Sequence, residues 1–150
     1  MHDTRGNYTV KSGHHRAMDL WRKEQGLTVA ISRDQWRYVW TASVPDKVKI
    51  WHWRAFQDVV PFLSRLVTKG VDCSVVCPMC EEANETLGHF VKGCPLLQSV
   101  VTISSIRDKF QQINIDSYGE FFAYIEKHWS KYERDLWMTI LWMAWDARNR

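Results

Sequence analysis

A run of eighteen residues in the middle of the chain restricts its possible folds more than any other segment. Residues 77–94 read CPMCEEANETLGHFVKGC, which is the pattern C-x2-C-x8-H-x4-C. Zinc prefers sulfur and imidazole nitrogen, takes four ligands in a tetrahedron and has no redox chemistry that would disturb thiolates. The spacing therefore predicts one zinc site, with Cys77, Cys80, His89 and Cys94 as ligands.

The first two ligands lie close enough to bind from one tight turn. A gap of two residues separates Cys77 from Cys80, and Pro78 favours a turn there because its ring fixes φ. Cys73 is the remaining cysteine. It is either a competitor for the place of Cys77 or a small apolar residue beside the site. The second interpretation is favoured, since Cys73 would break the two-residue gap.

The last two ligands lie on a segment that can be helical. Residues four or five apart on a helix project to nearly the same side, which would bring His89 and Cys94 together. Asn84 or Thr86 could cap this short helix, with Glu85 near its positive end.

Protein side chains would fill all four positions around the zinc. Structural zinc sites are closed in this way, whereas catalytic sites keep one position open for water. Binding of a structural zinc contributes on the order of 10–16 kcal/mol, and a whole domain has a net stability of roughly 5–15 kcal/mol. The metal could therefore decide whether the middle of the chain folds. The alternative is that the four cysteines are scattered and three of them are buried thiols. It does not explain why a histidine lies among them at the spacing of a zinc ligand.

The composition is that of a folded protein with an unusual number of large rings. Of 150 residues, 45% are hydrophobic and 25% charged, but nine are tryptophans, which dominate cores or mark interfaces. A net charge of +3 is too small to indicate nucleic-acid binding by itself. No signal peptide is visible, and the longest apolar run, residues 136–145, is too short to span a bilayer. We expect a soluble, intracellular protein without a membrane segment. The sequence does not distinguish nucleus from cytoplasm and does not indicate an oligomeric state.

Apolar spacing and capping residues predict a mainly α fold. The predicted helices cover residues 12–25, a segment from 32 or 34 to 43, then 46–59, 61–69, 95–112, 118–128 and 130–150. The expected organisation is a flexible segment at 1–10, a zinc-binding helical domain at 11–112 and C-terminal helices at 113–150. A small irregular zinc module, residues 73–97, lies in the middle. The last helix is apolar on all sides, which suits a fully buried helix or one missing a partner.

Several motifs together resemble one known family. The run VPDKVKIWHWRAFQDVVP at residues 44–61 is followed by CPMC, ETLGHF and GCP. This succession is similar to the zinc-binding domain of plant LINE-type reverse transcriptases. It departs from that family at Val60, where the family more often has leucine. YTVKSG at residues 8–13 resembles the segment upstream of that domain. WMAWDARNR at residues 142–150 resembles the stretch that precedes a ribonuclease H domain in these retrotransposon polyproteins.

The resemblance implies a non-catalytic accessory role. These polyproteins copy RNA into DNA, but the polymerase lies upstream of this region and the ribonuclease H domain downstream. The chain has no Asp-Asp pair, Gly-rich phosphate loop or nucleophile elbow, so an enzyme, including a metal-dependent one, is disfavoured. We expect a zinc-binding domain derived from a reverse transcriptase that assists binding of RNA or DNA beside the polymerase or ribonuclease H domains of its parent polyprotein.

Basic residues around the zinc motif are the candidates for nucleic-acid contact, because cations hold phosphates and aromatic rings stack bases. They are Lys47, Lys49, Arg54, Arg65, Lys69 and Lys92, together with Trp51. The simpler reading is that the tryptophans are core and the charges a solvated face. The alternative function is a protein–protein interaction or scaffold module that uses the apolar C-terminal helix.

Overall fold

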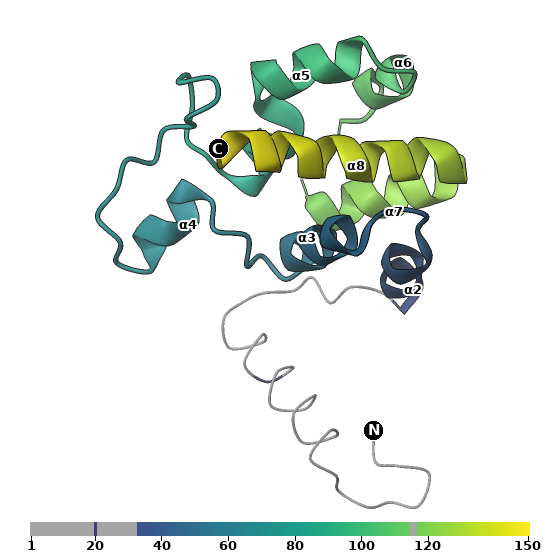
Figure 1. The fold of residues 1–150 in the computed structure, drawn as a ribbon, viewed down its shortest axis with the longest axis horizontal. Coiled ribbons are helices and arrows are strands. Elements are labelled where there is room, and N and C mark those ends of the chain that lie inside the picture. Colours follow the sequence, from purple (N-terminus) through teal and green to yellow (C-terminus); the bar gives the residue numbers. More distant parts are fainter. Residues whose placement is uncertain (1–19, 21–32, 115–116) are drawn as a thin grey trace, which may run out of the picture. The chain divides into compact units, whose positions relative to one another are not determined.

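A computed structural model describes Leu20, residues 33–114 and residues 117–150. Its helices in residues 33–150 are α2 (Arg33–Thr41), α3 (Asp46–Phe56), α4 (Leu63–Thr68), the π-helix η1 (His89–Gly93), α5 (Pro95–Thr102), α6 (Arg107–Gln111), α7 (Tyr118–His128) and α8 (Lys131–Arg148) (Figure 1). The described residues contain no β-strand, so the prediction of a mainly α fold with a small irregular zinc module is confirmed. The predicted flexible segment and, apart from Leu20, the first predicted helix lie outside the described residues.

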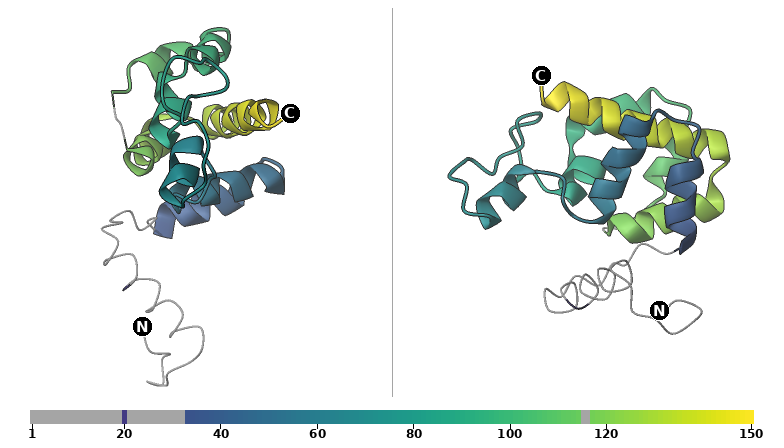
Figure 2. Two further views of the ribbon diagram at one scale, coloured as in Figure 1. Left: turned by 90° about the vertical axis from the view of Figure 1, so that its left-hand side faces the viewer. Right: turned by 60° about the horizontal axis from the view of Figure 1, so that its bottom comes forward.

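The C-terminal helix α8 is central to the packing. It contacts α3 on one side and α5 on the other, while α7 and α2 pack on α3. In Figures 1 and 2, α8 runs between the α5–α6 pair and the group formed by α2, α3 and α7. Residues on both sides of the predicted boundary at residue 112 therefore contribute to one core.

Aromatic rings fill that core. Trp137 on α8 is fully buried and packs against Phe110 of α6 and Phe121 of α7, with ring centroids 4.9 and 5.4 Å away. Met138 and Leu141 of the same helix are also fully buried. Much of the apolar surface of α8 therefore finds partners within the chain, while Met143 and Tyr132 stay exposed.

Two helices end in the same hydrogen-bonded motif. After α3, Asp58 takes a left-handed φ of 50°, its N–H donates to the carbonyl of Ala55, and Val59 donates to that of Arg54. This is a Schellman motif, and aspartate tolerates the left-handed conformation. The motif ends α3 at Phe56, whereas the sequence had predicted a helix that continues to residue 59. After α4, Gly70 (φ 84°) takes the equivalent place, as predicted.

The helix predicted at residues 95–112 is in fact two helices, α5 and α6. A β-branched run at residues 100–103 lowers helix propensity, and two serines follow it. The hydroxyl and the N–H of Ser104 both bond to the carbonyl of Val101. This local bonding competes with the helical pattern and turns the chain toward α6.

The start of α8 follows the prediction that Ser130 caps it. The Ser130 hydroxyl accepts from the N–H of Glu133 (3.3 Å), and the Glu133 carboxylate accepts from the N–H of Ser130 (2.8 Å), which is a complete capping box.

Over the described residues, no helix has both the length and the apolar character needed to cross a membrane.

Candidate metal centre

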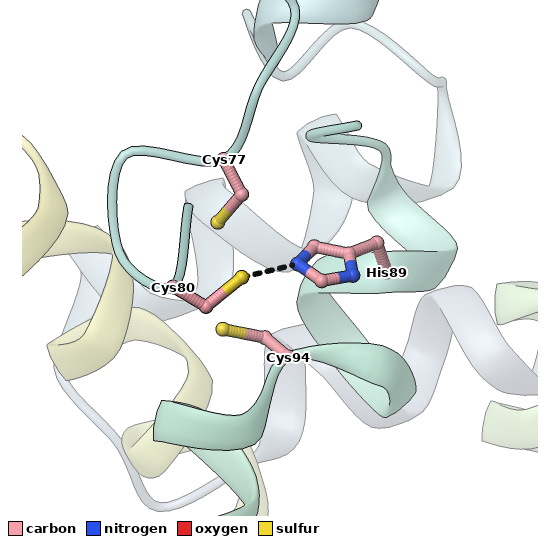
Figure 3. A group of neighbouring side chains, drawn as sticks. All are labelled: Cys77, Cys80, His89 and Cys94. Carbon is pink, nitrogen blue, oxygen red and sulfur yellow. Dashed lines mark hydrogen bonds between the residues drawn. The ribbon is translucent and has the colours of Figure 1, made fainter. Parts of the chain in front are cut away.

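The four predicted ligands come together in space. One potential ligand atom from each of Cys77, Cys80, His89 and Cys94 lies within 4.8 Å of all the others. Figure 3 shows the three sulfurs and the imidazole ring directed toward one another. Cys77 and Cys94 are buried, while Cys80 and His89 are half-buried. The group therefore lies at the edge of the core.

The group has the size and chemistry that one zinc ion needs. Zn–S bonds of about 2.3 Å and Zn–N bonds of about 2.0–2.1 Å at tetrahedral angles place ligand atoms roughly 3.5–3.8 Å apart. The Nε2 atom of His89 lies 3.3 Å from the sulfur of Cys80, so this nitrogen faces the centre. Small side-chain adjustments would bring all four atoms to zinc-bonding distance.

The first two cysteine ligands, Cys77 and Cys80, lie in a loop, residues 75–85, that closes on itself. Its two sides are joined by an isolated bridge between Val76 and Asn84 and by the bond from the N–H of Cys77 to the carbonyl of Ala83 (2.8 Å). The turn after Cys77 closes when the N–H of Glu81, at a left-handed φ of 59°, donates to the carbonyl of Cys77. We call these residues the metal loop.

The backbone of the metal loop acts on both thiols. Burial raises the pKa of Cys77, while the N–H groups of Cys80 and Met79 act in the opposite direction. The pKa of Cys80 is lowered, chiefly by the N–H of Glu82. Amide donors aimed at sulfur favour the thiolate, which is the form that binds metal.

A π-turn aligns the other two ligands. The N–H of Cys94 donates to the carbonyl of His89 (2.7 Å), an i to i−5 bond. In an α-helix, five residues turn the chain by roughly 500°, which would leave the two side chains about 140° apart. The expectation that residues five apart project to nearly the same side is therefore wrong for an α-helix. Closing the turn with five residues instead places them on the same side. The predicted helical segment is therefore present as a π-helix.

Thr86 and Gly93 support this turn from its two ends. The hydroxyl of Thr86 accepts from the N–H of His89 (3.0 Å), as one of the two predicted caps would. At the other end, a Cβ on Gly93 would lie 3.1 Å from Nδ1 of His89. Any larger residue there would require the imidazole to shift by a few tenths of an ångström.

Sequence reasoning missed the role of Glu85. Its side chain is completely buried and forms two hydrogen bonds with the guanidinium of Arg148, at the end of α8. It is therefore a buried ion-pair partner, a role that its predicted place near the positive end of a helix did not indicate. The two residues are 63 positions apart, and no local pattern indicates that they pair.

The predicted nucleic-acid residues have varied environments. Trp51 is only 4% exposed and packs against Phe90 and Trp145, so its ring is not open to a base. The ammonium of Lys47 lies over Trp142, although the residue is exposed. Lys92 contacts the ring and carbonyl of Phe110. Lys92 is therefore half-buried at the edge of the core, with its ammonium directed at Phe110.

The remaining basic candidates are partly engaged in ion pairs. Lys49 bonds to Asp46 (3.2 Å), and Arg65 pairs with Asp58. Arg54 and Lys69 are exposed.

A second aromatic and basic surface, on α2, escaped the sequence prediction. Arg33, Trp36, Arg37 and Trp40 are all exposed, and their spacing of i, i+3, i+4 and i+7 places them on one helix face. The two indole rings contact each other, with centroids 5.6 Å apart. We call these four residues the α2 face. The repeated Trp and Arg at i, i+4 was the signal that could have revealed it.

Comparison with known proteins gives one match. The model of a family described as zinc-binding in reverse transcriptase matches residues 10–100, more than half of the chain. No curated protein and no solved structure matches. The matched region contains all four residues of the metal centre and the run at residues 44–61 on which the resemblance rested. The chain therefore belongs to the family of zinc-binding domains of reverse transcriptases.

Proposed function

We propose that Cys77, Cys80, His89 and Cys94 bind one zinc ion in a structural site. The supporting observation is that the protein alone offers three sulfurs and one ring nitrogen within 4.8 Å of one another. A zinc with these four ligands has no open position for water or substrate. The chain then acts as a non-catalytic module whose middle segment is held together by the metal.

Elemental analysis of the purified chain tests the metal assignment. One zinc per chain is expected, and the Cys94→Ser variant should retain none. The matched control is Cys73→Ser, since Cys73 lies outside the group of four. Loss of zinc from the Cys73 variant but not from the Cys94 variant would refute the assignment.

We further propose that the module helps a neighbouring polymerase or ribonuclease H domain to hold single-stranded RNA or DNA. The α2 face supports this proposal, because Trp36 and Trp40 are 44% and 39% exposed and stand beside two arginines. Base–aromatic stacking contributes about 1–3 kcal/mol per base, and arginines hold the phosphates between bases. Helix α3 packs against α2 and carries two more exposed cations, Lys47 and Arg54.

Titration with a labelled single-stranded RNA at two salt concentrations tests this function. Affinity should fall as salt rises, and Arg37→Ala should lower the slope of log K against log salt by about 1. Trp36→Ala should weaken binding about 5-fold or more, from the lower end of the stacking range. Tyr132→Ala is the control, since Tyr132 is a well-exposed ring on α8. Binding that is independent of salt, or weakened equally by the Tyr132 variant, would refute the proposal.

The alternative of a protein-interaction module was based on an apolar C-terminal helix without a partner. Trp137, Met138 and Leu141 of this helix are fully buried within the chain, which leaves Met143 as an exposed apolar side chain of the predicted run. The nucleic-acid proposal is therefore the better supported of the two.

A further inference from the structure

We infer that Arg148 is a positioning residue of the metal centre, which it supports through Glu85. This inference rests on the proposed zinc ligation. Glu85 ends the metal loop that carries Cys77 and Cys80, and it stands four residues before His89. It is thus the point where the two halves of the ligand set join.

The contact between the two side chains is bidentate and buried. Nε and Nη2 of Arg148 donate to Oε1 and Oε2 of Glu85, each over 2.6 Å. Glu85 is 0% exposed and the Arg148 side chain 14%. The N–H of Leu63, at the start of α4, donates to the same carboxylate (2.8 Å). A planar guanidinium fork matches a carboxylate in this way, and a lysine cannot.

The backbone of Glu85 is tied down as well. Its N–H donates to the carbonyl of Val75 (2.7 Å), which closes the metal loop. Its carbonyl accepts from the hydroxyl of Ser64 (2.7 Å). Glu85 therefore joins three parts of the chain: the metal loop, the start of α4 and the end of α8.

The same end of α8 also reaches the other half of the ligand set. Trp145, one turn before Arg148, packs edge-on against Phe90, with ring centroids 6.0 Å apart. It packs against Phe62, next to α4, at 5.1 Å. Phe90 directly follows His89. The last turns of α8 thus contact the chain on both sides of the metal loop.

A consequence for zinc affinity follows. Zinc binding includes the free energy of ordering the segments that carry its ligands. Without Arg148, Glu85 would be a buried carboxylate with no counter-ion, which is strongly unfavourable. The metal loop would lose its native position, and zinc affinity would fall. The family match ends at residue 100, so this support comes from outside the matched region.

The test compares two variants of the full chain that remove the same charge. Arg148→Met breaks the buried pair. Arg150→Met removes an arginine whose partner, Asp146, lies on the exposed side of the helix. Zinc affinity is measured by competition with a chelator. We expect Arg148→Met to bind zinc about 10-fold or more weakly than the unchanged chain, because it leaves a buried carboxylate unpaired at the end of the metal loop, and Arg150→Met to bind unchanged. Equal affinities of the two variants would overturn the inference.

Two further variants keep the test decisive if Arg148→Met does not fold. Arg148→Lys keeps the charge but not the fork, and should bind zinc more weakly than the unchanged chain. The double variant Glu85→Gln with Arg148→Met leaves no unpaired buried carboxylate, so it should fold, and it should also bind zinc more weakly than the unchanged chain because the tie between α8 and the metal loop is gone. Zinc affinity equal to that of the unchanged chain in both variants would overturn the inference. An unchanged chain that binds no zinc would instead refute the proposed ligation, on which the inference rests.

Discussion

The buried histidine of α3 allows a quantitative prediction about pH. His52 is fully buried, with Nε2 2.9 Å from the carbonyl of Met138 on α8 and Nδ1 bonded to the hydroxyl of Tyr118 on α7. The carbonyl only accepts, so Nε2 carries the proton and Nδ1 accepts from the tyrosine in a neutral imidazole. Burial raises the pKa of Tyr118 well above its usual value, so that group stays neutral.

Burial also lowers the pKa of His52, from 6.5 to about 4. The unfolded chain therefore binds more protons than the folded chain between these values, and stability decreases as pH falls through this window. The full difference of roughly 2.5 pKa units corresponds to about 3 kcal/mol. Between about pH 7.5 and about pH 5, the expected loss from this residue is about 2 kcal/mol.

Urea unfolding of the unchanged chain and of His52→Gln at both pH values isolates this effect. Acid also releases zinc, but it does so in both proteins, so the difference between them reports on His52. Near neutral pH the glutamine variant should be less stable by about 1–3 kcal/mol, because a flexible amide replaces the ring that bonds both Tyr118 and Met138. That gap should shrink by about 2 kcal/mol toward the lower pH. A gap that stays constant with pH would refute the reasoning.

Three more predictions concern the metal centre and the last helix. Cys94→Ser should loosen residues 70–97 as well as release zinc, which hydrogen exchange would show as faster exchange there; protection equal to that of the unchanged chain would contradict it. Gly93→Ala should weaken zinc binding in a chelator competition, since the new methyl would lie 3.1 Å from Nδ1 of His89; unchanged affinity would mean that the ring can move aside. Ser130→Ala should cost about 1 kcal/mol in urea unfolding through loss of the capping box of α8, and no measurable cost would show that this cap is unimportant.

Local features of the fold were readable from the sequence. The ligand spacing predicted the group of four side chains, and Ser130 and Gly70 predicted a helix start and a helix end, because each depends on neighbouring residues only. The π-turn between His89 and Cys94 was not predicted, since apolar periodicity does not distinguish it from an α-helical turn.

Features that depend on tertiary packing could not be read in this way. Helix α3 has apolar residues around most of its circumference. The sequence therefore could not show that Trp51 faces Phe90 and Trp145 rather than solvent. The pairing of Glu85 with Arg148 depends on the end of α8 coming next to the end of the metal loop, which only the tertiary packing decides.

X-ray absorption at the zinc edge of the purified chain tests the central claim most directly. The account predicts three sulfur neighbours at about 2.3 Å and one nitrogen neighbour at about 2.0–2.1 Å. A zinc with a water oxygen in its shell, or with fewer than three sulfurs, would contradict a closed structural site formed by Cys77, Cys80, His89 and Cys94.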